Sequence, residues 1–573
     1  MKKIYILLLI APLAGAQVPL YTTSKFVDKN YVKARVNSIN NRSWDAFGTN
    51  NASYEVPKGN GTHAQFANSI WIGGYDHNGK LHLAANTYMQ KGRDFWGGPI
   101  DTTAIGAYNA TNTASYNKLW KTDCSDITSF ATAYNNGSVT ANTYTVASDL
   151  LTYPAKGNAN FMKNMEPFYD ANLNGIYDPL VGGDYPLIKG HQQVLSIYND
   201  TLGKHAESKA RCMGVEIHER SYAYFDPLLP DSMQAVNYST FYHFTMFNRS
   251  AETYTNVFVS DWSDVDLGYY EDDFVGSDSA NNFTYIYNGD NFDETALGVK
   301  GYGSKIPVIS HAILKTNCMD GIDNDGDNVI DEPGESFVMN RSTFYNNNLG
   351  PILAATTNPD SAKHYYQYMS GVWKDGTPFT YGGQAYGGIR PTDYVYTGNP
   401  ANNSGWTEMN AGNTPGDRRV FTTSGPFTLP AGARIEWGYA VVFSRDTANN
   451  VNTITQFNTR VRRDVRNVLY YDQMHQNAQC TPLVMTGLQK QTLGNPFFSL
   501  WPNPTDGVFN ITLNERLANG NVVVRDVSGR TILETKMNED GTASINLSAC
   551  EKGIYLVEVS AGGNITAGKV IRN

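Results

Sequence analysis

The sequence has few cysteines, and none of them lies in a Cys-x-x-Cys pair. The five are Cys124, Cys212, Cys318, Cys480 and Cys550. This scatter excludes a zinc ribbon and a thioredoxin-like redox motif. Because the number is odd, at least one thiol has no partner within the chain. Disulfide bonds and a full set of free thiols both stay open as alternatives.

The signature motifs of the common enzyme classes are also missing. His218-Glu219 lacks the second histidine of a His-Glu-x-x-His zinc site. No Gly-x-Ser-x-Gly elbow, phosphate-binding glycine loop or dinucleotide fingerprint occurs either. These absences count against an enzyme, although distant residues can still assemble a catalytic site. We therefore predict no catalytic residues.

Basic residues are outnumbered, with 44 Lys and Arg against 54 Asp and Glu, a formal charge of -10. This balance argues against nucleic acid and anionic membranes as partners, because both reward positive charge. It permits cation binding. After the N-terminus, no run approaches the ~18 consecutive apolar residues that a membrane-spanning helix needs. We expect no transmembrane segment.

The N-terminus has the three parts of a secretory signal in their required order. Lys2 and Lys3 supply the positive charge, and residues 4–13 form a short apolar stretch. Ala14-Gly15-Ala16 follows as a small-x-small cleavage site. The sequence therefore predicts a signal peptide over residues 1–16 and export through the periplasm to the outer cell surface or the medium.

The composition favours strands joined by turns, since 52 Gly and 37 Tyr accompany few helical patterns. We predict a mainly β protein: a multi-domain β-sandwich passenger with one or few helices, followed by a small C-terminal sandwich. Apolar residues spaced by three or four predict a helix near 451–469. The expected parts are residues 17–200 and 201–479 of the passenger, a linker over 480–496, and a C-terminal unit over 497–573.

Several turn and strand motifs occur in order within the C-terminal unit. They are Pro502, Asn503, Pro504 and Gly507 at its start, Gly529 in a central turn, and Gly553, Tyr555 and Lys569 in the closing strands. In this order they resemble the type A C-terminal sorting domain of type IX secretion. The resemblance implies an immunoglobulin-like β-sandwich that an outer-membrane translocon recognises. It also implies a Bacteroidetes-type envelope, removal of the domain, and attachment to surface lipopolysaccharide or release.

One acidic loop has alternate carboxylates suited to a hard cation. Asp323, Asp325 and Asp327 stand at loop positions one, three and five. Val329 can offer a carbonyl at position seven, and Asp331 and Glu332 follow. Ca²⁺ takes six to eight oxygen ligands in a flexible shell, which such a turn supplies. The loop departs from an EF-hand, so a solvated acidic loop is the alternative.

Two further segments carry the same chemistry. The second candidate calcium site comprises Asp170, Asn172, Asn174, Ile176, Asp178 and Asp184, and an Asx-rich turn is its alternative. The third comprises Asp264, Asp266, Asp272 and Asp273. Paired carboxylates also perform acid–base catalysis in glycosidases, so the third segment admits a catalytic alternative.

Beside the acidic loops, the passenger carries the motifs Trp71-Ile72-Gly73-Gly74, Asp94-Phe95-Trp96, Gly175-Ile176-Tyr177-Asp178-Pro179 and Trp373-Lys374-Asp375-Gly376. With these motifs, most of residues 60–445 resembles large secreted proteins that carry the same sorting domain, a likeness that brings no assigned activity. We predict a secreted or cell-surface, calcium-binding structural or adhesive protein. The alternative is a secreted glycoside hydrolase or glycan-binding protein that uses carboxylates of 261–278. In a glycan-binding role, Trp71, Trp96 and Trp373 are candidates for stacking on sugar rings.

Overall fold

The computed structural model describes residues 23–101, 116–157, 161–316, 336–347, 353–446, 453–475, 480, 498–513, 520–526, 530–538, 540–561 and 564–573. The chain forms two compact units, Met1–Pro482 and Leu483–Asn573. Strands make up 40% of the structure and helices 15%, which confirms the mainly β class. No helix among the described residues is long and apolar enough to cross a membrane.

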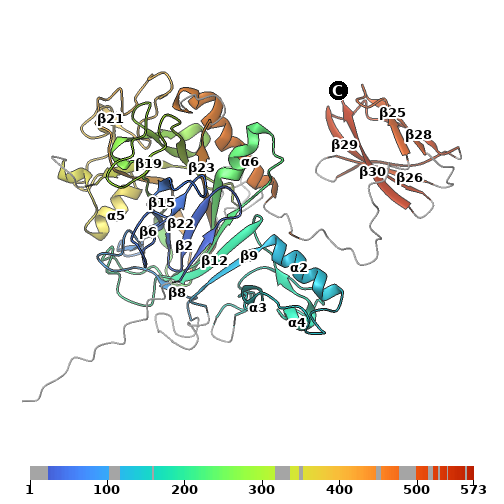
Figure 1. The fold of residues 1–573 in the computed structure, drawn as a ribbon, viewed down its shortest axis with the longest axis horizontal. Helices are drawn as coiled ribbons and strands as arrows, with labels where there is room; N and C mark the ends of the chain where they lie inside the picture. The colour runs from blue at the N-terminus through green and yellow to red at the C-terminus, as the bar shows by residue number, and fades with distance from the viewer. Residues whose placement is uncertain are drawn as a thin grey trace, which may run out of the picture. The chain divides into compact units, whose positions relative to one another are not determined.

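The first unit contains a large antiparallel sheet, here called sheet A (Figure 1). Its described strands are β1 (Ser24–Val27), β2 (Lys33–Asn37), β3 (Asn41–Arg42), β4 (Tyr54–Glu55), β5 (His63–Gln65), β6 (Ala67–Tyr75), β7 (Leu81–Ala84), β15 (Tyr254–Asp264), β19 (Arg341–Asn346) and β22 (Arg418–Leu429). They follow the order β19-β22-β15-β6-β3-β2-β4-β5, with β1 beside β2 and β7 beside β6.

A second antiparallel sheet, sheet B, lies in the same unit. Its described strands are β8 (Trp96–Gly97), β9 (Leu119–Asp123), β12 (Gln192–Asn199), β13 (Val215–Ala223), β14 (Ser239–Asn248), β16 (Asp273–Asp278), β17 (Phe283–Asn288), β18 (Val308–Ile313) and β23 (Arg434–Ser444). They follow the order β16-β17-β18-β23-β14-β13-β12-β8, with β9 beside β12. Two short ribbons pair β10 (Phe168–Tyr169) with β11 (Tyr185–Pro186), and β20 (Thr380–Tyr381) with β21 (Arg390–Pro391).

The helices are short. The α-helices are α2 (Cys124–Asn135), α3 (Ser148–Leu151), α4 (Pro179–Gly182), α5 (Ala362–Met369) and α6 (Arg462–His475). The 3-10 turns are η1 (Asp231–Tyr238), η2 (Tyr270–Asp272), η3 (Ser279–Asn281), η4 (Ala354–Thr356) and η5 (Thr453–Gln456), and η6 (Phe457–Val461) is a π turn.

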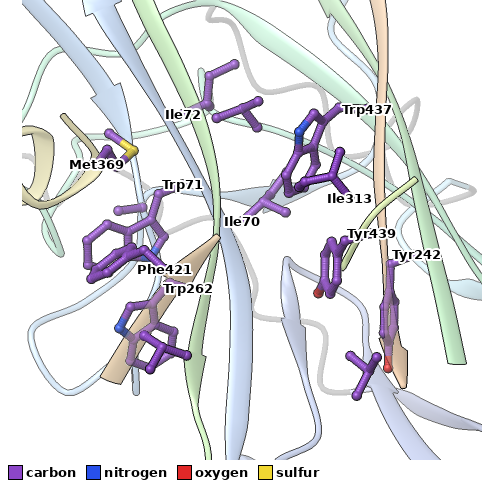
Figure 2. Packing of buried hydrophobic residues seen from close by; sticks show 14 of the residues in the cluster. Ile70, Trp71, Ile72, Tyr242, Trp262, Ile313, Met369, Phe421, Trp437 and Tyr439 are labelled. Carbon is purple, nitrogen blue, oxygen red and sulfur yellow. The ribbon is translucent and has the colours of Figure 1, made fainter. Parts of the chain in front are cut away.

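The two sheets share one aromatic core. Strand β6 is buried within this core, which explains why its sequence is apolar on both faces. Figure 2 places Trp71 on the same side as Trp262, with Ile70 and Ile72 on the side of Trp437 and Tyr439 from β23 of sheet B. The rings of Trp71 and Trp262 stack with centroids 5.8 Å apart, and Tyr365 of α5 covers Trp71 at 4.8 Å. A strand buried on both faces needs large apolar side chains at consecutive positions.

The passenger has no internal division near residue 200. Strand β12 ends at Asn199 and pairs along its length with β13, and β6 pairs with β15. Residues from both expected regions therefore build both sheets, and the passenger is one unit rather than several domains. Strand pairing between remote segments leaves no mark on local sequence patterns, which explains the difference.

Cys124 and Cys480 form a disulfide bond, which resolves one alternative left open by the sequence. Cys212 and Cys550 are free, and Cys318 lies outside the described residues. Because Cys480 is tied to α2, the first unit reaches past the expected start of the linker at 480. The rest of that linker lies outside the described residues.

The expected helix near 451–469 is present but longer and less regular. It begins as the 3-10 turn η5, continues through η6, and then extends as α6 to His475. Its basic residues form ion pairs, such as Arg462 with Asp278 and Arg460 with Asp446.

The second unit consists of two facing sets of antiparallel strands. One holds β24 (Phe498–Trp501), β25 (Val508–Leu513) and β28 (Thr542–Asn546), in the order β24-β25-β28. The other holds β26 (Asn521–Asp526), β27 (Thr531–Lys536), β29 (Gly553–Ala561) and β30 (Asn564–Arg572), in the order β27-β26-β29-β30. Side chains alternate between buried and exposed along β25 and β26, as a small sandwich requires.

The predicted sorting residues have defined roles in this unit. Pro502, Asn503 and Pro504 follow β24, and the side chain of Asn503 bonds to the backbone of Lys569 and Ile571 on β30. Gly507 has a φ of 138°, and a Cβ there would meet Ser548. The buried Tyr555 follows Gly553 and donates its hydroxyl to the carbonyl of Glu551 over 2.7 Å. Gly529 lies outside the described residues.

Candidate metal-binding pocket

The first candidate calcium site is the acidic loop from Asp323 to Glu332. Asp323, Asp325, Asp327, Val329, Asp331 and Glu332 all lie outside the described residues. Calcium binding at that loop stays a prediction.

The second acidic segment folds into a compact loop between β10 and α4. Asp170 accepts hydrogen bonds from the backbone N–H groups of Asn174 (3.1 Å) and Gly175 (2.7 Å). Asp184 accepts from the N–H groups of Ala171 and Asp178, both at 2.9 Å. These hydrogen bonds shape the loop, but the carboxylates of Asp170, Asp178 and Asp184 do not converge within 4.8 Å as the group of three described below does.

In this loop, only one of the two carboxylate oxygens of Asp178 accepts a hydrogen bond from the described residues. The Nδ2 group of Asn174 donates to Oδ2 of Asp178 over 3.2 Å. Oδ1 of Asp178 is buried and has no hydrogen-bond partner among the described residues. Burial raises the pKa of Asp184, and this effect together with the carboxylate of Asp178 outweighs the lowering by the N–H groups of Asp178 and Ala171. A cation would satisfy this oxygen and relieve the repulsion.

The third segment forms a carboxylate triad with a residue that the sequence did not indicate. Asp264 ends β15, Asp266 follows it, and Asp417 immediately precedes β22. One carboxylate oxygen from each lies within 4.8 Å of the other two. The pairing of Asp264 with Arg419 in the β15–β22 register brings these remote segments together.

The carboxylate of Asp264 accepts two hydrogen bonds, and both go to the same oxygen, Oδ2. Tyr88 donates its hydroxyl to Oδ2 over 2.6 Å, and Arg419 donates from an NH2 group over 3.1 Å. Arg419 also pairs with Asp417. Oδ1 of Asp264 is buried with no hydrogen-bond partner among the described residues. The residues of the triad therefore fit a hard cation, since an unpaired buried carboxylate oxygen is costly.

The proton affinities of the triad reflect this crowding. Burial is the largest influence on Asp264, and it outweighs the guanidinium of Arg419 to raise the pKa to about 7. Burial raises the pKa of Asp266 well above its usual value, and the charges of Asp264 and Asp417 add to the effect. One arginine does not neutralise three neighbouring carboxylates.

Asp272 and Asp273, predicted as ligands of the same site, make other contacts. Asp273 accepts from the N–H group of Leu267 over 3.0 Å, and Asp272 accepts from Asn288 over 2.8 Å. Burial and a hydrogen bond with Glu294 raise the pKa of Asp272 to about 8. Neither residue belongs to the triad of Asp264, Asp266 and Asp417.

The triad opens into a cavity of about 490 Å³, here called the triad pocket. Lys91 and Arg419 supply positive charge in its wall. The aromatic residues of the wall are Trp44, Phe66, Tyr88, Tyr270, Tyr345 and Tyr365. Carboxylate oxygens beside the faces of aromatic rings are suited to bind a cation together with an oxygen-rich ligand.

The three tryptophans considered for sugar stacking are buried. Trp71 and Trp373 are fully enclosed, and Trp96 is 4% exposed. The hypothesis that these residues stack on an external sugar is therefore wrong, because their rings are packed in the core.

Comparison with known proteins identifies one part of the chain. No curated protein matches it significantly in sequence. Among solved structures, it is similar to a polysaccharide lyase at 9% identity and a TM-score of 0.19, covering 66% of this chain and 35% of that one. It is similar to a biofilm-associated protein (BSP domain) at 10% identity and a TM-score of 0.12, covering 67% and 60%.

The chain thus spans about a third of the lyase and 60% of the biofilm-associated protein, and TM-scores this low assign neither fold nor function. The sequence of residues 499–573, in contrast, matches the family of secretion system C-terminal sorting domains. This match agrees with the strand unit of residues 498–573 and its sorting motifs. The chain is a type IX secreted protein of the Bacteroidetes kind, exported to the cell surface or extracellular space and ending in a C-terminal sorting domain.

Proposed function

We propose that this exported protein is a calcium-binding structural or adhesive surface protein whose ion is held by Asp264, Asp266 and Asp417. The observation that carries the proposal is the convergence of three carboxylates within 4.8 Å. Without a cation, this arrangement is unfavourable because like charges repel at short range. Ca²⁺ is the expected ion, because the donors are oxygens and the medium outside the cell supplies it.

The pocket supports an adhesive role for the bound ion. Ca²⁺ takes six to eight oxygen ligands, so three carboxylates leave coordination positions facing the cavity. The half-buried rings of Phe66, Tyr88 and Tyr270 line the same space. A glycan hydroxyl or a carboxylate of a protein ligand would complete the shell from the open side.

The glycoside hydrolase alternative receives less support from this geometry. Retaining glycosidases hold their two carboxyl groups about 5–5.5 Å apart, and inverting enzymes hold them farther apart. The triad brings one oxygen from each of three carboxylates within 4.8 Å, and Arg419 and Tyr88 hold Asp264 in place. A shared cation explains three converging carboxylates, whereas a catalytic pair needs only two.

The sorting domain adds the translocon of type IX secretion as a partner. We also propose attachment to surface lipopolysaccharide after processing, which would place the triad pocket on the outside of the cell. The loop of Asp170, Asn172, Asn174 and Asp178 would hold a second, structural Ca²⁺.

Calorimetric titration of Ca²⁺ into chelator-treated protein lacking residues 1–16 tests the proposal. We expect the double variant Asp266→Asn with Asp417→Asn to lose one binding event, while wild type and the control Asp231→Asn keep it. Asp231 is an exposed aspartate outside the pocket. Identical titrations of wild type and double variant, at equal melting temperature in chelator, would remove the triad as the ion site.

A further inference from the structure

A second cavity, of about 550 Å³, lies against sheet B. Its floor is formed by neighbouring strands β13, β14 and β23, which contribute Arg220, His243 and Glu436. The segment from α2 to β12 covers it and contributes Lys189, Met162 and Met165. We call this space the Lys189 cavity.

Positive charge dominates the described lining of the Lys189 cavity. Lys189, Arg220 and Arg434 face one carboxylate, that of Glu436. Arg434 pairs with Glu436. Arg220 stands directly opposite His243 in the antiparallel register of β13 and β14. The cations therefore come from two strands, β13 and β23, and from the covering segment.

Arg220 is fixed in place by its partners. Its Nε and NH2 groups donate to Glu166, each over 2.9 Å, and its NH1 group donates to Thr245 over 2.8 Å. In contrast, Nζ of the half-buried Lys189 has no hydrogen bond or ion pair among the described residues. An unpaired ammonium group in such a site is available to a ligand anion.

His243 presents an unused ring nitrogen in the same place. Its Nε2 lies 3.2 Å from Oε2 of Glu436, and its Nδ1 is buried with no partner among the described residues. Burial, with the charge of Lys189, lowers the pKa of His243 to about 4, so the ring is neutral at pH 7. A neutral ring that donates from Nε2 to a carboxylate keeps Nδ1 as an acceptor. This acceptor requires a donor from the ligand.

We propose that the Lys189 cavity binds a ligand carrying both a carboxylate and a hydroxyl group. The carboxylate pairs with Nζ of Lys189, and the hydroxyl donates to Nδ1 of His243. Met162, Met165 and Phe247 line the cavity as apolar walls for the carbon skeleton. Hydroxy acids and acidic sugars share this chemistry. The site is separate from the triad pocket and does not depend on calcium.

Calorimetric titration of the protein lacking residues 1–16, in chelator, tests the proposal with three probes: D-galacturonate, D-galactose and lactate. We expect galacturonate to bind at least tenfold more tightly than galactose, which lacks the carboxylate. Equal binding of lactate and galacturonate would identify a hydroxy-acid site. Tighter binding of galacturonate would identify an acidic-sugar site.

The variant Lys189→Gln distinguishes binding in the Lys189 cavity from nonspecific electrostatic attraction of the anion to the protein. It should bind galacturonate at least tenfold more weakly than wild type, whereas the control Lys204→Gln, an exposed lysine outside the cavity, should bind equally. Equal melting temperatures show that both variants are folded. The proposal is overturned if none of the probes binds at millimolar concentration, if galactose matches galacturonate, or if Lys189→Gln binds like wild type.

Discussion

The hydroxyl of Tyr88 donates a hydrogen bond of 2.6 Å to Oδ2 of Asp264. The same hydroxyl accepts from Nε of Arg419 over 2.7 Å. Tyr88 therefore occupies one oxygen of the carboxylate and leaves Oδ1 for another partner. The tyrosine acts as a positioning group for the candidate calcium ligand rather than as a ligand itself.

Replacing Tyr88 by Phe should weaken calcium binding at the triad pocket. Without this hydrogen bond, the Asp264 side chain has to be ordered as the ion binds, which costs about 0.5–1.5 kcal/mol and corresponds to a roughly two- to tenfold rise in Kd. Calorimetry measures the change. Tyr386→Phe is the matched control, since it removes a 2.6 Å hydrogen bond to Asp375 outside the pocket. A Tyr88→Phe protein with unchanged affinity would argue against the positioning role.

Arg42 and Glu219 form a buried ion pair of 2.7 Å, with both side chains almost fully enclosed. The guanidinium also lies over the rings of Tyr242 and Phe244, which belong to sheet B. Arg42→Met leaves the buried carboxylate of Glu219 without its cation, so it should destabilise the protein by about 3–5 kcal/mol. The double variant Arg42→Met with Glu219→Leu should be less destabilised than the single one. Denaturant unfolding measures both, and an equal or greater loss in the double variant would contradict this account.

Stability should depend on pH through a buried network around His218. His218 lies 2.7 Å from Glu166 and 3.2 Å from Glu216. Burial alone would raise the pKa of Glu216, but His218 and Arg249 lower it to about 2. Burial alone would lower the pKa of His218, but the two glutamates raise it.

The signs of these two shifts define a pH window. The contribution of Glu216, on the order of 3 kcal/mol, is present above pH 4.5 and is lost as the pH falls toward 2. The contribution of His218 is present below pH 6.5 and is lost as the pH rises through its folded-state pKa. Melting curves of wild type and Glu216→Gln should differ most between pH 4.5 and 6.5 and converge toward pH 2. A difference independent of pH would refute the linkage.

Removal of the sorting domain should stop export at the outer membrane. A chain that lacks residues 499–573 keeps the predicted signal peptide of residues 1–16 and the first compact unit, but loses the sorting domain. We expect it to accumulate in the periplasm, as measured by cell fractionation and surface proteolysis. The control is a chain with Ser499→Ala, an exposed position of β24, which should reach the surface normally.

Local chemistry made several elements of the fold predictable. The apolar run of residues 69–74 followed by Asn78-Gly79 is the local pattern of a strand and a hairpin turn. The structure has β6, a turn with Gly79 at a φ of 68°, and β7 at these positions. Turn residues and alternating side chains act over a few positions, so one sequence is sufficient to reveal them. The sorting domain was recognised for the same reason, because its motifs are short and ordered.

Contacts between remote segments were not predictable in this way. Asp417 completes the triad with Asp264 only because β15 and β22 pair in a fixed register. The Cys124–Cys480 bond joins residues 356 positions apart. The two passenger regions expected from the sequence form one unit for the same reason, because β6 pairs with β15 and β12 pairs with β13.

The sequence by itself determined the export route, the β class, the sorting domain and the acidic segments, because each depends on residues close together in the chain. Only the tertiary structure decided which carboxylates meet, which tryptophans are buried and where cavities form. Those outcomes depend on strand register and on packing between two sheets, and both are set by the burial of the whole core rather than by any local run of residues.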